Sequence, residues 1–511
     1  MLDRVGCTAL GALFLLGACT HEADVPEAEP VTEVAEAPAP DTETFAIRLF
    51  DKTIGELTAT TEGDTVTVDY EYRNNGRGPT LAETIVLGED GLPVGWTVDG
   101  ATTFGNEIHE TFALEDGTAS WTDTTGPGSA EASEPTVYIP QNGTPYALAV
   151  YAKALLADAD NKLPAWPAGE LSLDALESVT VDGDGGPVEA TAYALVGDDV
   201  DPTYFLAEDD GSLFAYISPR FVIVREGYEA ADTQLKELAA RLSTERLETI
   251  QAETAHKFDA PLAITNVRVF DAEAKALTEP STVMVEDGVI TAVSADDMDT
   301  SGAYVIDGQG GTLVPGLIDM HGHVSQDAAL KNIAAGVTTI RDMGNDNAVL
   351  SELIAKIDAG TLAGPRIVRS GFVEGKSPFS SNNGILVNSE EEAVAAVDWY
   401  ADQGDFFQIK VYNSMNPAWV PAIVKRAKER GLRVTGHVPA FTDADHMIEA
   451  GYDEMTHINQ VMLGWVLAQG EDTRTLLRLT ALQRLLVPRA HLCSDDVLGA
   501  SCAHVVCCSL A

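Results

Sequence analysis

Two histidines stand two residues apart directly after an apolar run, in the stretch Pro315-Gly316-Leu317-Ile318-Asp319-Met320-His321-Gly322-His323. On a β-strand, residues at this spacing share a face. A pair of imidazoles at the end of a buried parallel strand forms half of a metal site. His321 and His323 are therefore candidate metal ligands, and the remaining ligands are expected downstream.

Three further candidates lie at the ends of predicted strands. Lys410, His437 and His457 occur in the segments 406–412, 432–438 and 452–457, respectively. Enzymes built on a parallel (β/α) barrel assemble their sites from the C-terminal ends of several strands. The distribution of these five side chains over four strands is typical of such a site.

Lys410 has an unusual position within its predicted strand. Strict alternation places it on the face opposite Phe407, Ile409 and Val411, which directs an ammonium group into the interior. Burial of this charge is costly unless the charge is removed or paired. The alternative is a lysine whose stem extends to solvent. Tyr412 shares the face of Lys410, so we predict that its hydroxyl polarises a substrate carbonyl.

The elements that must position these residues alternate between helix and strand, as a parallel α/β barrel requires. Apolar periodicity predicts helices at 328–335, 348–359, 390–402, 417–430 and 443–450. Strands are predicted at 336–342, 366–370, 406–412, 432–438 and 452–457, after a first strand that ends at the histidine pair.

The chain upstream of the histidine pair shows a different pattern. Apolar residues recur with period two between Thr44 and Val224, which predicts an antiparallel β domain, either a sandwich or a meander. Residues 227–256 carry leucines at helical spacing and are predicted to form a connecting helix. Residues 259–314 return to short strands and include a hairpin signal at Asp287-Gly288.

The N-terminus reads as an export signal. Arg4 precedes an apolar run, and Leu16-Gly17-Ala18-Cys19 resembles a bacterial lipobox, which implies a lipid-modified Cys19 and a lipid-anchored protein of the bacterial cell envelope, periplasmic or in the outer membrane. A cleaved secretory peptide is the alternative. The acidic, Ala- and Pro-rich segment 20–42 is expected to be a tether. The net charge of −49 argues against binding of nucleic acid.

Several stretches together carry a family resemblance. A β unit containing Glu286-Asp287-Gly288 is followed by "PGLIDMHGH", "IKVYNS", "GHVP" and "GYDEMTHINQ". From about residue 260 to 484 the sequence resembles the amidohydrolase superfamily, and most closely its imidazolonepropionase-like and Xaa-Pro dipeptidase-like branch. The resemblance implies an α/β fold in which a small β sandwich precedes a metal-binding (β/α)8 barrel, here with only about six strands.

The resemblance also implies roles for the candidate residues. His321 and His323 would hold the more buried of two divalent metal ions, His437 and His457 would hold the second, and Lys410, carboxylated by carbon dioxide, would bridge them. The donors suit zinc. A metal-activated hydroxide would attack a carbon–nitrogen bond in a cyclic amide or a small peptide. The alternative is a non-catalytic, lipid-anchored binding protein with a degenerate barrel.

The sequence departs from the family pattern after His457. The family places an aspartate at the end of strand eight, and only 54 residues follow His457, so the barrel is expected to be truncated. We interpret residues 486–511 as an aberrant tail, out of frame from near Leu485. The competing reading is a small zinc-binding tail formed by Cys493, Cys502, His504, Cys507 and Cys508. The sequence leaves the oligomeric state open.

These observations predict seven segments. They are a signal peptide (1–19), the tether (20–42), an N-terminal antiparallel β domain (43–226), a helical connector (227–258), a small β sandwich (259–314), a truncated metal-binding barrel (315–485) and the aberrant tail (486–511).

Overall fold

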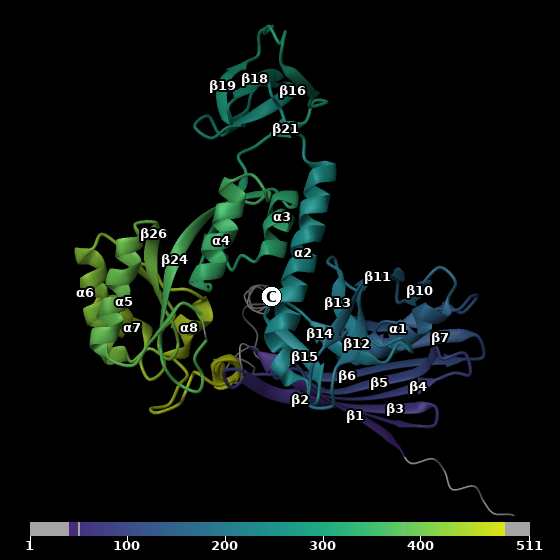
Figure 1. Ribbon diagram of the computed structural model, residues 1–511. Helices are drawn as coiled ribbons and strands as arrows, with labels where there is room; N and C mark the ends of the chain where they lie inside the picture. Colours follow the sequence, from purple (N-terminus) through teal and green to yellow (C-terminus); the bar gives the residue numbers. More distant parts are fainter. Residues whose placement is uncertain (1–39, 50–51, 382, 486–511) are drawn as a thin grey trace, which may run out of the picture. The chain divides into compact units, whose positions relative to one another are not determined.

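The structure is a computed structural model that describes residues 40–485 except 50–51 and 382 (Figure 1). It has a mixed α/β fold that contains three β-sheets. The predicted signal peptide with Cys19, nearly all of the tether, and the tail 486–511 lie outside the described residues. None of the helices within the described ranges is both long enough and apolar enough to span a bilayer.

The N-terminal sheet contains fifteen strands in the order β8 to β1 followed by β15 to β9. Its strands are β1 (Asp41–Leu49), β2 (Lys52–Glu62), β3 (Thr65–Tyr72), β4 (Thr80–Leu87), β5 (Pro93–Ala101), β6 (Glu107–Glu115), β7 (Thr118–Asp123), β8 (Gly126–Glu131), β9 (Val137–Tyr138), β10 (Lys162–Trp166), β11 (Glu170–Val181), β12 (Val188–Val196), β13 (Thr203–Ala207), β14 (Leu213–Ile217) and β15 (Phe221–Arg225). Neighbours pair antiparallel except β9 and β10. Among the described residues, the order of neighbouring strands matches the meander alternative.

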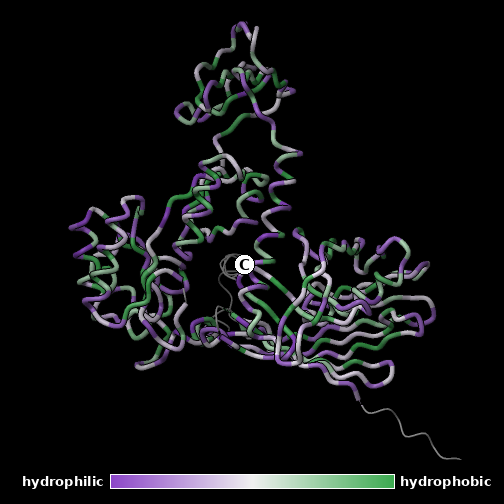
Figure 2. Tube along the Cα trace, in the orientation of Figure 1, coloured by the Kyte–Doolittle hydropathy of each residue, from purple (hydrophilic) through white to green (hydrophobic). Residues whose placement is uncertain are grey.

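Helices pack on the N-terminal sheet and complete its cores. Helix α1 (Ala147–Ala157) buries Leu148, Tyr151 and Leu155 in a core shared with β1 to β6 and β10 to β13. The connector, α2 (Asp232–Thr254), buries Leu235 and Leu242 against β12 to β15. Polar and apolar residues alternate along the N-terminal strands, as Figure 2 shows. The period-two pattern therefore reflects one buried face on each strand.

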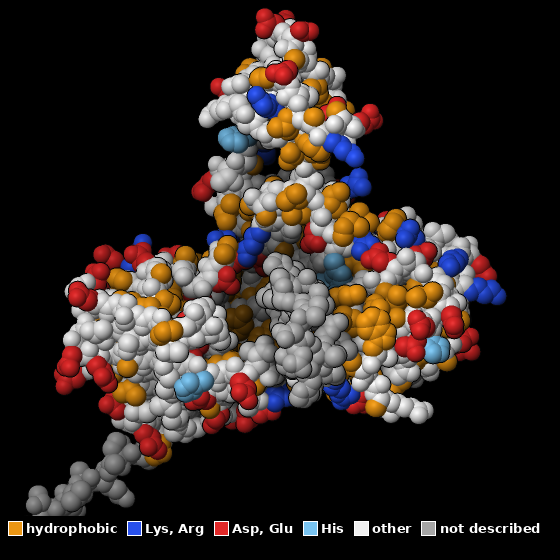
Figure 3. All heavy atoms as spheres, turned by 180° about the vertical axis from the view of Figure 1, so that it is seen from behind, with side chains coloured by type: hydrophobic (Ala, Val, Ile, Leu, Met, Phe, Trp, Pro, Cys, Tyr) orange, Lys and Arg blue, Asp and Glu red, His pale blue; other side chains and the backbone are white. Residues whose placement is uncertain are grey.

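Residues 262–313 form a second sheet with six strands. They are β16 (Leu262–Asp271), β17 (Ala276–Leu277), β18 (Ser281–Glu286), β19 (Val289–Ser294), β20 (Tyr304–Asp307) and β21 (Thr312–Leu313). Strands β18 and β19 pair through Asp287 and Gly288, which have φ values of 51° and 75°. This confirms the predicted hairpin, with both turn residues in the conformation that a two-residue turn needs. Apolar side chains such as those of Val289 and Val305 are exposed on this unit (Figure 3).

The third sheet positions the candidate metal ligands. Its strands run parallel in the order β22 (Leu317–Gly322), β23 (Val337–Asp342), β24 (Arg366–Gly375), β26 (Phe406–Val411) and β27 (Arg433–Gly436), and β25 (Ile385–Val387) pairs with β24. The helices between and after them are α3 (Gln326–Ala334), α4 (Asn347–Asp358), α5 (Glu390–Gln403), α6 (Val420–Glu429) preceded by η2 (Pro417–Trp419), α7 (Ala444–Ala450), α8 (Ile458–Leu463), α9 (Leu477–Thr480) and η3 (Ala481–Leu485). The predicted alternation of strand and helix is confirmed up to β27.

Helix N-caps define where several of these helices begin. Ser325, Asp346, Ser389 and Asp443 each accept a hydrogen bond from the first turn of α3, α4, α5 and α7, respectively. Such side chains satisfy amide groups that a helix leaves unpaired at its start. The caps therefore define the first residue of each helix after the preceding strand or loop.

The predicted strand at 452–457 is wrong. The segment lies beside β27, because the amides of Asp453 and Thr456 donate to the carbonyls of Val434 and Gly436, both at 2.9 Å. The Val434 amide, however, donates to the side chain of Asp453 at 2.8 Å rather than to a backbone carbonyl. This side-chain bond interrupts the ladder, so the segment follows the sheet without forming a strand.

Candidate metal centre

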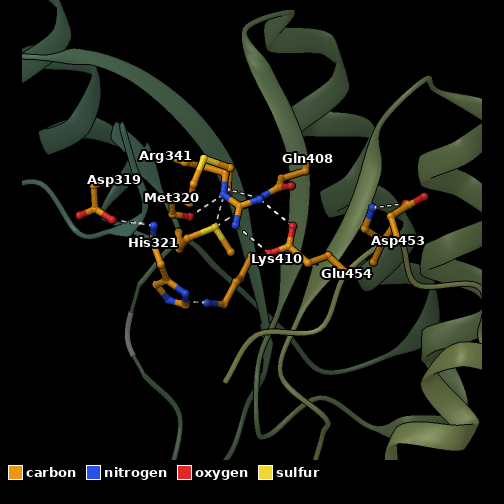
Figure 4. Close-up of polar contacts among 11 residues, drawn as sticks. Asp319, Met320, His321, Arg341, Gln408, Lys410, Asp453 and Glu454 are labelled. Carbon is orange, nitrogen blue, oxygen red and sulfur yellow. Dashed lines mark hydrogen bonds and ion pairs between the residues drawn. The ribbon is translucent and has the colours of Figure 1, made fainter. Parts of the chain in front are cut away.

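The structure brings all four candidate histidines and Lys410 together. The ring centroid of His321 lies 5.7 Å from that of His323 and 4.6 Å from that of His457. The rings of His437 and His457 are 4.8 Å apart. Lys410 Nζ lies 3.4 Å from His321 Nε2, and Figure 4 shows these two side chains pointing toward each other.

These residues come from opposite edges of the parallel sheet. His321 lies near the end of β22 at one edge, whereas His437 follows β27 and His457 follows the segment beside it. The short distance between His321 and His457 therefore requires the sheet to curl, as in part of a barrel. His457 has a φ of 64°, which is unusual for a residue other than glycine. Such strained residues cluster at functional sites.

Lys410 is buried. Its side chain is only 1% exposed, which excludes the alternative that it extends to solvent. Burial, followed by the nearby Arg341 charge, lowers the pKa of the Lys410 ammonium to about 8. With this pKa about a tenth of the lysine is a neutral amine at pH 7, far more than for an unperturbed lysine, and only the amine form can react with carbon dioxide.

His321, His437 and His457 are held neutral by their surroundings. Burial, followed by the Lys410 charge, lowers the pKa of His321 to about 3 and that of His457 to about 4. The same two causes hold the pKa of His437 well below its usual range. Neutral imidazole is the form that ligates metals, so the protein keeps these side chains in a ligand-competent state.

Hydrogen bonds on the Nδ1 atoms set two ring tautomers. His323 Nδ1 donates to the carbonyl of Gly344 at 2.7 Å, and His437 Nδ1 donates to Asn413 Oδ1 at 2.6 Å. Each Nε2 is then left with a free lone pair. His437 Nε2 is buried and has no hydrogen-bond partner. An unpartnered buried acceptor is costly, and a divalent cation would satisfy it. The residues therefore fit a metal.

The predicted catalytic residue Tyr412 lies beside the histidines. Its ring centroid is 4.1 Å from that of His437 and 5.0 Å from that of Phe372. Tyr412 is half-buried, and it follows β26 two residues after Lys410. The contact with a substrate carbonyl stays a prediction.

Sequence reasoning missed several residues that hold the candidate ligands. Asp342 is fully buried, and its carboxylate accepts from the amides of Val324 at 2.8 Å and Gly344 at 3.0 Å, on either side of the His323 contact. Arg341 contacts the backbone of Met320, next to His321. The available signal was the pair of charged residues that ends an apolar strand, 337–340.

Glu374 is a further missed residue, at the end of β24. Its carboxylate accepts from the amides of Ser381 at 2.5 Å and Ser414 at 3.1 Å. Burial raises the pKa of Glu374 to about 8. Glu374 holds two loops that flank the parallel sheet. The described residues contain no group of three or more His, Cys, Asp or Glu side chains arranged to hold a metal ion.

Residues 312–506 match the model of the amidohydrolase family. The chain is also similar to an enamidase from Eubacterium barkeri, with 34% identity over 212 residues, which are 35% of this chain and 52% of the relative. The chain thus spans about half of the length of this curated relative.

Several solved structures resemble part of the chain. A putative prolidase from Bifidobacterium longum is 23% identical, with 43% of this chain and 60% of that chain covered and a TM-score of 0.34. A Xaa-Pro dipeptidase with bound methionine is 22% identical, with 39% and 62% covered and a TM-score of 0.33. A bottromycin amidohydrolase is 22% identical, with 48% and 51% covered and a TM-score of 0.36.

Proposed function

We propose that this protein is a metal-dependent hydrolase of carbon–nitrogen bonds, because residues 312–506 match the model of the amidohydrolase family. The observation that carries the proposal is the convergence of neutral imidazoles on the buried Lys410, with the unpartnered Nε2 of His437 among them. Groups that are buried without partners and close together are expected where a ligand completes them.

The roles proposed for the residues are those that the family resemblance implies, and the clustering of the five side chains supports them. We propose that His321 and His323 hold one divalent metal ion, that His437 and His457 hold a second, and that carboxylated Lys410 is shared between them. Zinc suits imidazole and carboxylate-type oxygen donors. When bound, divalent metals supply Lewis acidity toward a water molecule and the scissile carbonyl. Tyr412 is proposed to orient that carbonyl through its hydroxyl.

The proposed substrate is a cyclic amide or a small peptide. The enamidase name of the curated relative supports an amide bond as the target. The cleft beside the centre is lined by His323, Phe372 and Tyr412 and has a volume of about 1030 Å³. This is large enough for a small organic substrate.

Metal analysis of the full chain tests this function. The protein is depleted with a chelator, reloaded with Zn²⁺ or Mn²⁺, and assayed for bound metal and for hydrolysis of dipeptides and lactams. We expect bound divalent metal, and activity that disappears on depletion and returns on reloading. Protein that binds no divalent metal would overturn the proposal, and metal-loaded protein inactive toward the whole panel would favour the binding-protein alternative.

Lys410→Met sharpens this test. Residues that hydrogen-bond to a metal ligand typically contribute about 10- to 100-fold to metal affinity. Loss of a direct ligand is therefore expected to reduce metal affinity at least about 100-fold. Metal-free Lys410→Met should be no less stable than the parent, because it lacks a buried ammonium. Lys425→Met, on the exposed face of α6, is the matched control and should bind metal normally.

We also propose that the protein is lipid-anchored in the cell envelope through Cys19. The lipobox-like stretch Leu16-Gly17-Ala18-Cys19 supports this location. Labelling with a clickable fatty acid in a bacterial host should mark the parent protein and not Cys19→Ser. Equal labelling of both would refute the anchor.

A further inference from the structure

An ion pair inside the curled sheet connects the backbone next to two candidate ligands. The guanidinium of Arg341, on β23, donates through both terminal nitrogens to the two carboxylate oxygens of Glu454, each at 2.7 Å. Its Nε donates to the carbonyl of Met320 at 2.7 Å (Figure 4). Met320 directly precedes His321, and Glu454 lies three residues before His457. One side chain therefore contacts the chain beside both histidines.

We propose that Arg341 and Glu454 are positioning residues that fix the separation between the two halves of the metal centre. This inference rests on the proposed function, because it assigns His321 and His457 to different metal ions. Neither residue would contact metal or substrate. Each would act by holding the backbone that carries a ligand.

The backbone hydrogen bonds of the parallel sheet do not determine the distance between His321 and His457. Strand β22 lies at one edge of the described sheet, and the segment 452–457 lies beside β27 at the other, so no shared ladder joins them. The pairing of β22 with β23 is also irregular, with register shifts on both sides of Asp319. His457 itself follows a segment that is not a strand. The side-chain bridge supplies the connection that the sheet lacks.

The chemistry of the bridge suits a rigid spacer. A guanidinium is planar, and a bidentate pair with a carboxylate fixes both distance and orientation. The third donor, Nε, adds the contact to Met320 in the same plane. Arg341 is only 8% exposed, while the Glu454 side chain is 35% exposed, so the pair is shielded from water mainly on the side of the arginine. The distance between the two backbone segments is thus set by one rigid group.

His323 is held by separate contacts. Asp342 accepts from the amides of Val324 and Gly344, and the Gly344 carbonyl accepts from His323 Nδ1. Removing Arg341 should therefore disturb the relation between the two halves while the position of His323 persists. This predicts loss of the shared arrangement rather than a uniform loss of all ligands.

The same sheet offers a matched control. Arg369, on β24, is also 8% exposed, is ion-paired with Asp405, and donates to Ser351 Oγ at 2.8 Å. Its carboxylate partner stands directly before β26 and is not next to a candidate ligand. Arg369→Met removes a buried, paired guanidinium at a comparable cost in packing, with no link to the centre.

The experiment compares full-length Arg341→Met, Arg341→Lys, Glu454→Gln and Arg369→Met with the parent. Each protein is depleted and titrated with Mn²⁺, and bound metal and the electron paramagnetic resonance of exchange-coupled Mn²⁺ pairs are measured. Thermal unfolding of the metal-free proteins reports the structural cost. Glu454→Gln keeps the side-chain volume, so the test stands even if Arg341→Met folds poorly.

We expect Arg341→Met and Glu454→Gln each to weaken binding of the second Mn²⁺ by about 10- to 100-fold and to lose the coupled signal. A variant that carries both Arg341→Met and Glu454→Gln should be little worse than either single variant, because both substitutions remove the same bridge. Arg341→Lys should not restore the signal, since lysine keeps the charge without the planar fork. Arg369→Met should lower thermal stability and retain the signal.

Two outcomes would overturn this inference and leave the proposed function standing. One is Mn²⁺ binding like that of the parent in both Arg341→Met and Glu454→Gln, and the other is an equal loss of the second Mn²⁺ in Arg369→Met. Full rescue by Arg341→Lys would show that the charge matters instead of the geometry. A parent protein that binds no Mn²⁺ refutes the proposed function itself, and with it this inference.

Discussion

Ionisable side chains are buried both in the N-terminal sheet and in the parallel sheet, but they are paired differently. In the N-terminal sheet Glu110 is 2% exposed, and its carboxylate accepts from the hydroxyl of Tyr138 and from the amides of Gln141 and Asn142. In the parallel sheet His437 is 3% exposed, and its Nε2 has no partner. The two side chains are equally buried, yet only one has its bonding capacity filled.

The difference separates structural from functional burial. The protein satisfies Glu110 with groups of the loop before α1, so the carboxylate anchors that loop. It satisfies only Nδ1 of His437 and leaves Nε2 without a partner in a ring whose centroid lies 4.8 Å from that of His457. Burial alone therefore does not identify a candidate site. The Nε2 atom of His437 is of interest because it lacks a partner and also lies among the other candidate ligands.

Glu110→Ala is the substitution with the largest expected effect, and it tests whether the buried Glu110 has a structural role. It leaves the buried hydroxyl of Tyr138 and the partly buried amide bonds of Gln141 and Asn142 without their acceptor, so we expect a loss of about 3 kcal/mol in the free energy of unfolding, measured with urea. Glu107→Ala, an exposed position on the same strand, is the control. Metal content should be unchanged in both. A loss of metal in Glu110→Ala without a loss of stability would break the comparison.

Asn413→Ala tests whether the buried His437 serves as a metal ligand. Without Asn413 Oδ1, His437 loses the contact that sets its tautomer. We expect metal affinity to fall about 10- to 100-fold, or about 1.4 to 2.8 kcal/mol, in a competition titration with a chelating dye. Asn416→Ala, which removes an exposed cap of η2, should bind like the parent. Unchanged affinity in Asn413→Ala would mean that the ring is oriented by other contacts.

Substitution of Glu83, a second buried carboxylate of the N-terminal sheet, is expected to have the smallest effect on stability. Burial raises its pKa from 4.5 to about 7, although Thr144 donates to the carboxylate. Because the folded pKa is the higher one, its contribution to stability is complete below about pH 4.5 and is lost as the pH rises through 7. Between about pH 5 and pH 6 the parent should lose on the order of 1 kcal/mol relative to Glu83→Gln. Parallel stability profiles would contradict this sign.

The ligand-bearing part of the parallel sheet was largely predictable from sequence. The spacing of His321 and His323 and the alternation around Lys410 are local patterns, and Lys410 is buried as its alternation requires. The expectation of a buried strand before the histidine pair is wrong, because Leu317, Ile318 and Met320 on β22 are exposed at the edge of the sheet. The residues that hold them were not predictable in the same way. Arg341 acts through Glu454, which is 113 positions away, and no local pattern encodes that pairing.

Two other elements show where periodicity fails. Helix α1 has the sequence ALAVYAKALLA and is buried on nearly all sides, so it lacks the polar face by which a surface helix is recognised. The segment 452–457 has a strand-like sequence, but the Asp453 side chain takes the place of a backbone partner. In both cases the tertiary environment overrides the local pattern.

The strand order of the N-terminal sheet has a consequence for how that sheet opens. Nearly every strand pairs with a neighbour in sequence, and the main exception is the antiparallel pairing of β1 with β15, where Phe45 lies opposite Arg225. Every other pairing closes a short loop, whereas this one closes a loop that contains almost the entire domain, at a greater entropic cost. The sheet is thus two ribbons of local contacts joined along one seam. Hydrogen exchange by sub-global opening is expected to separate the ribbons there first.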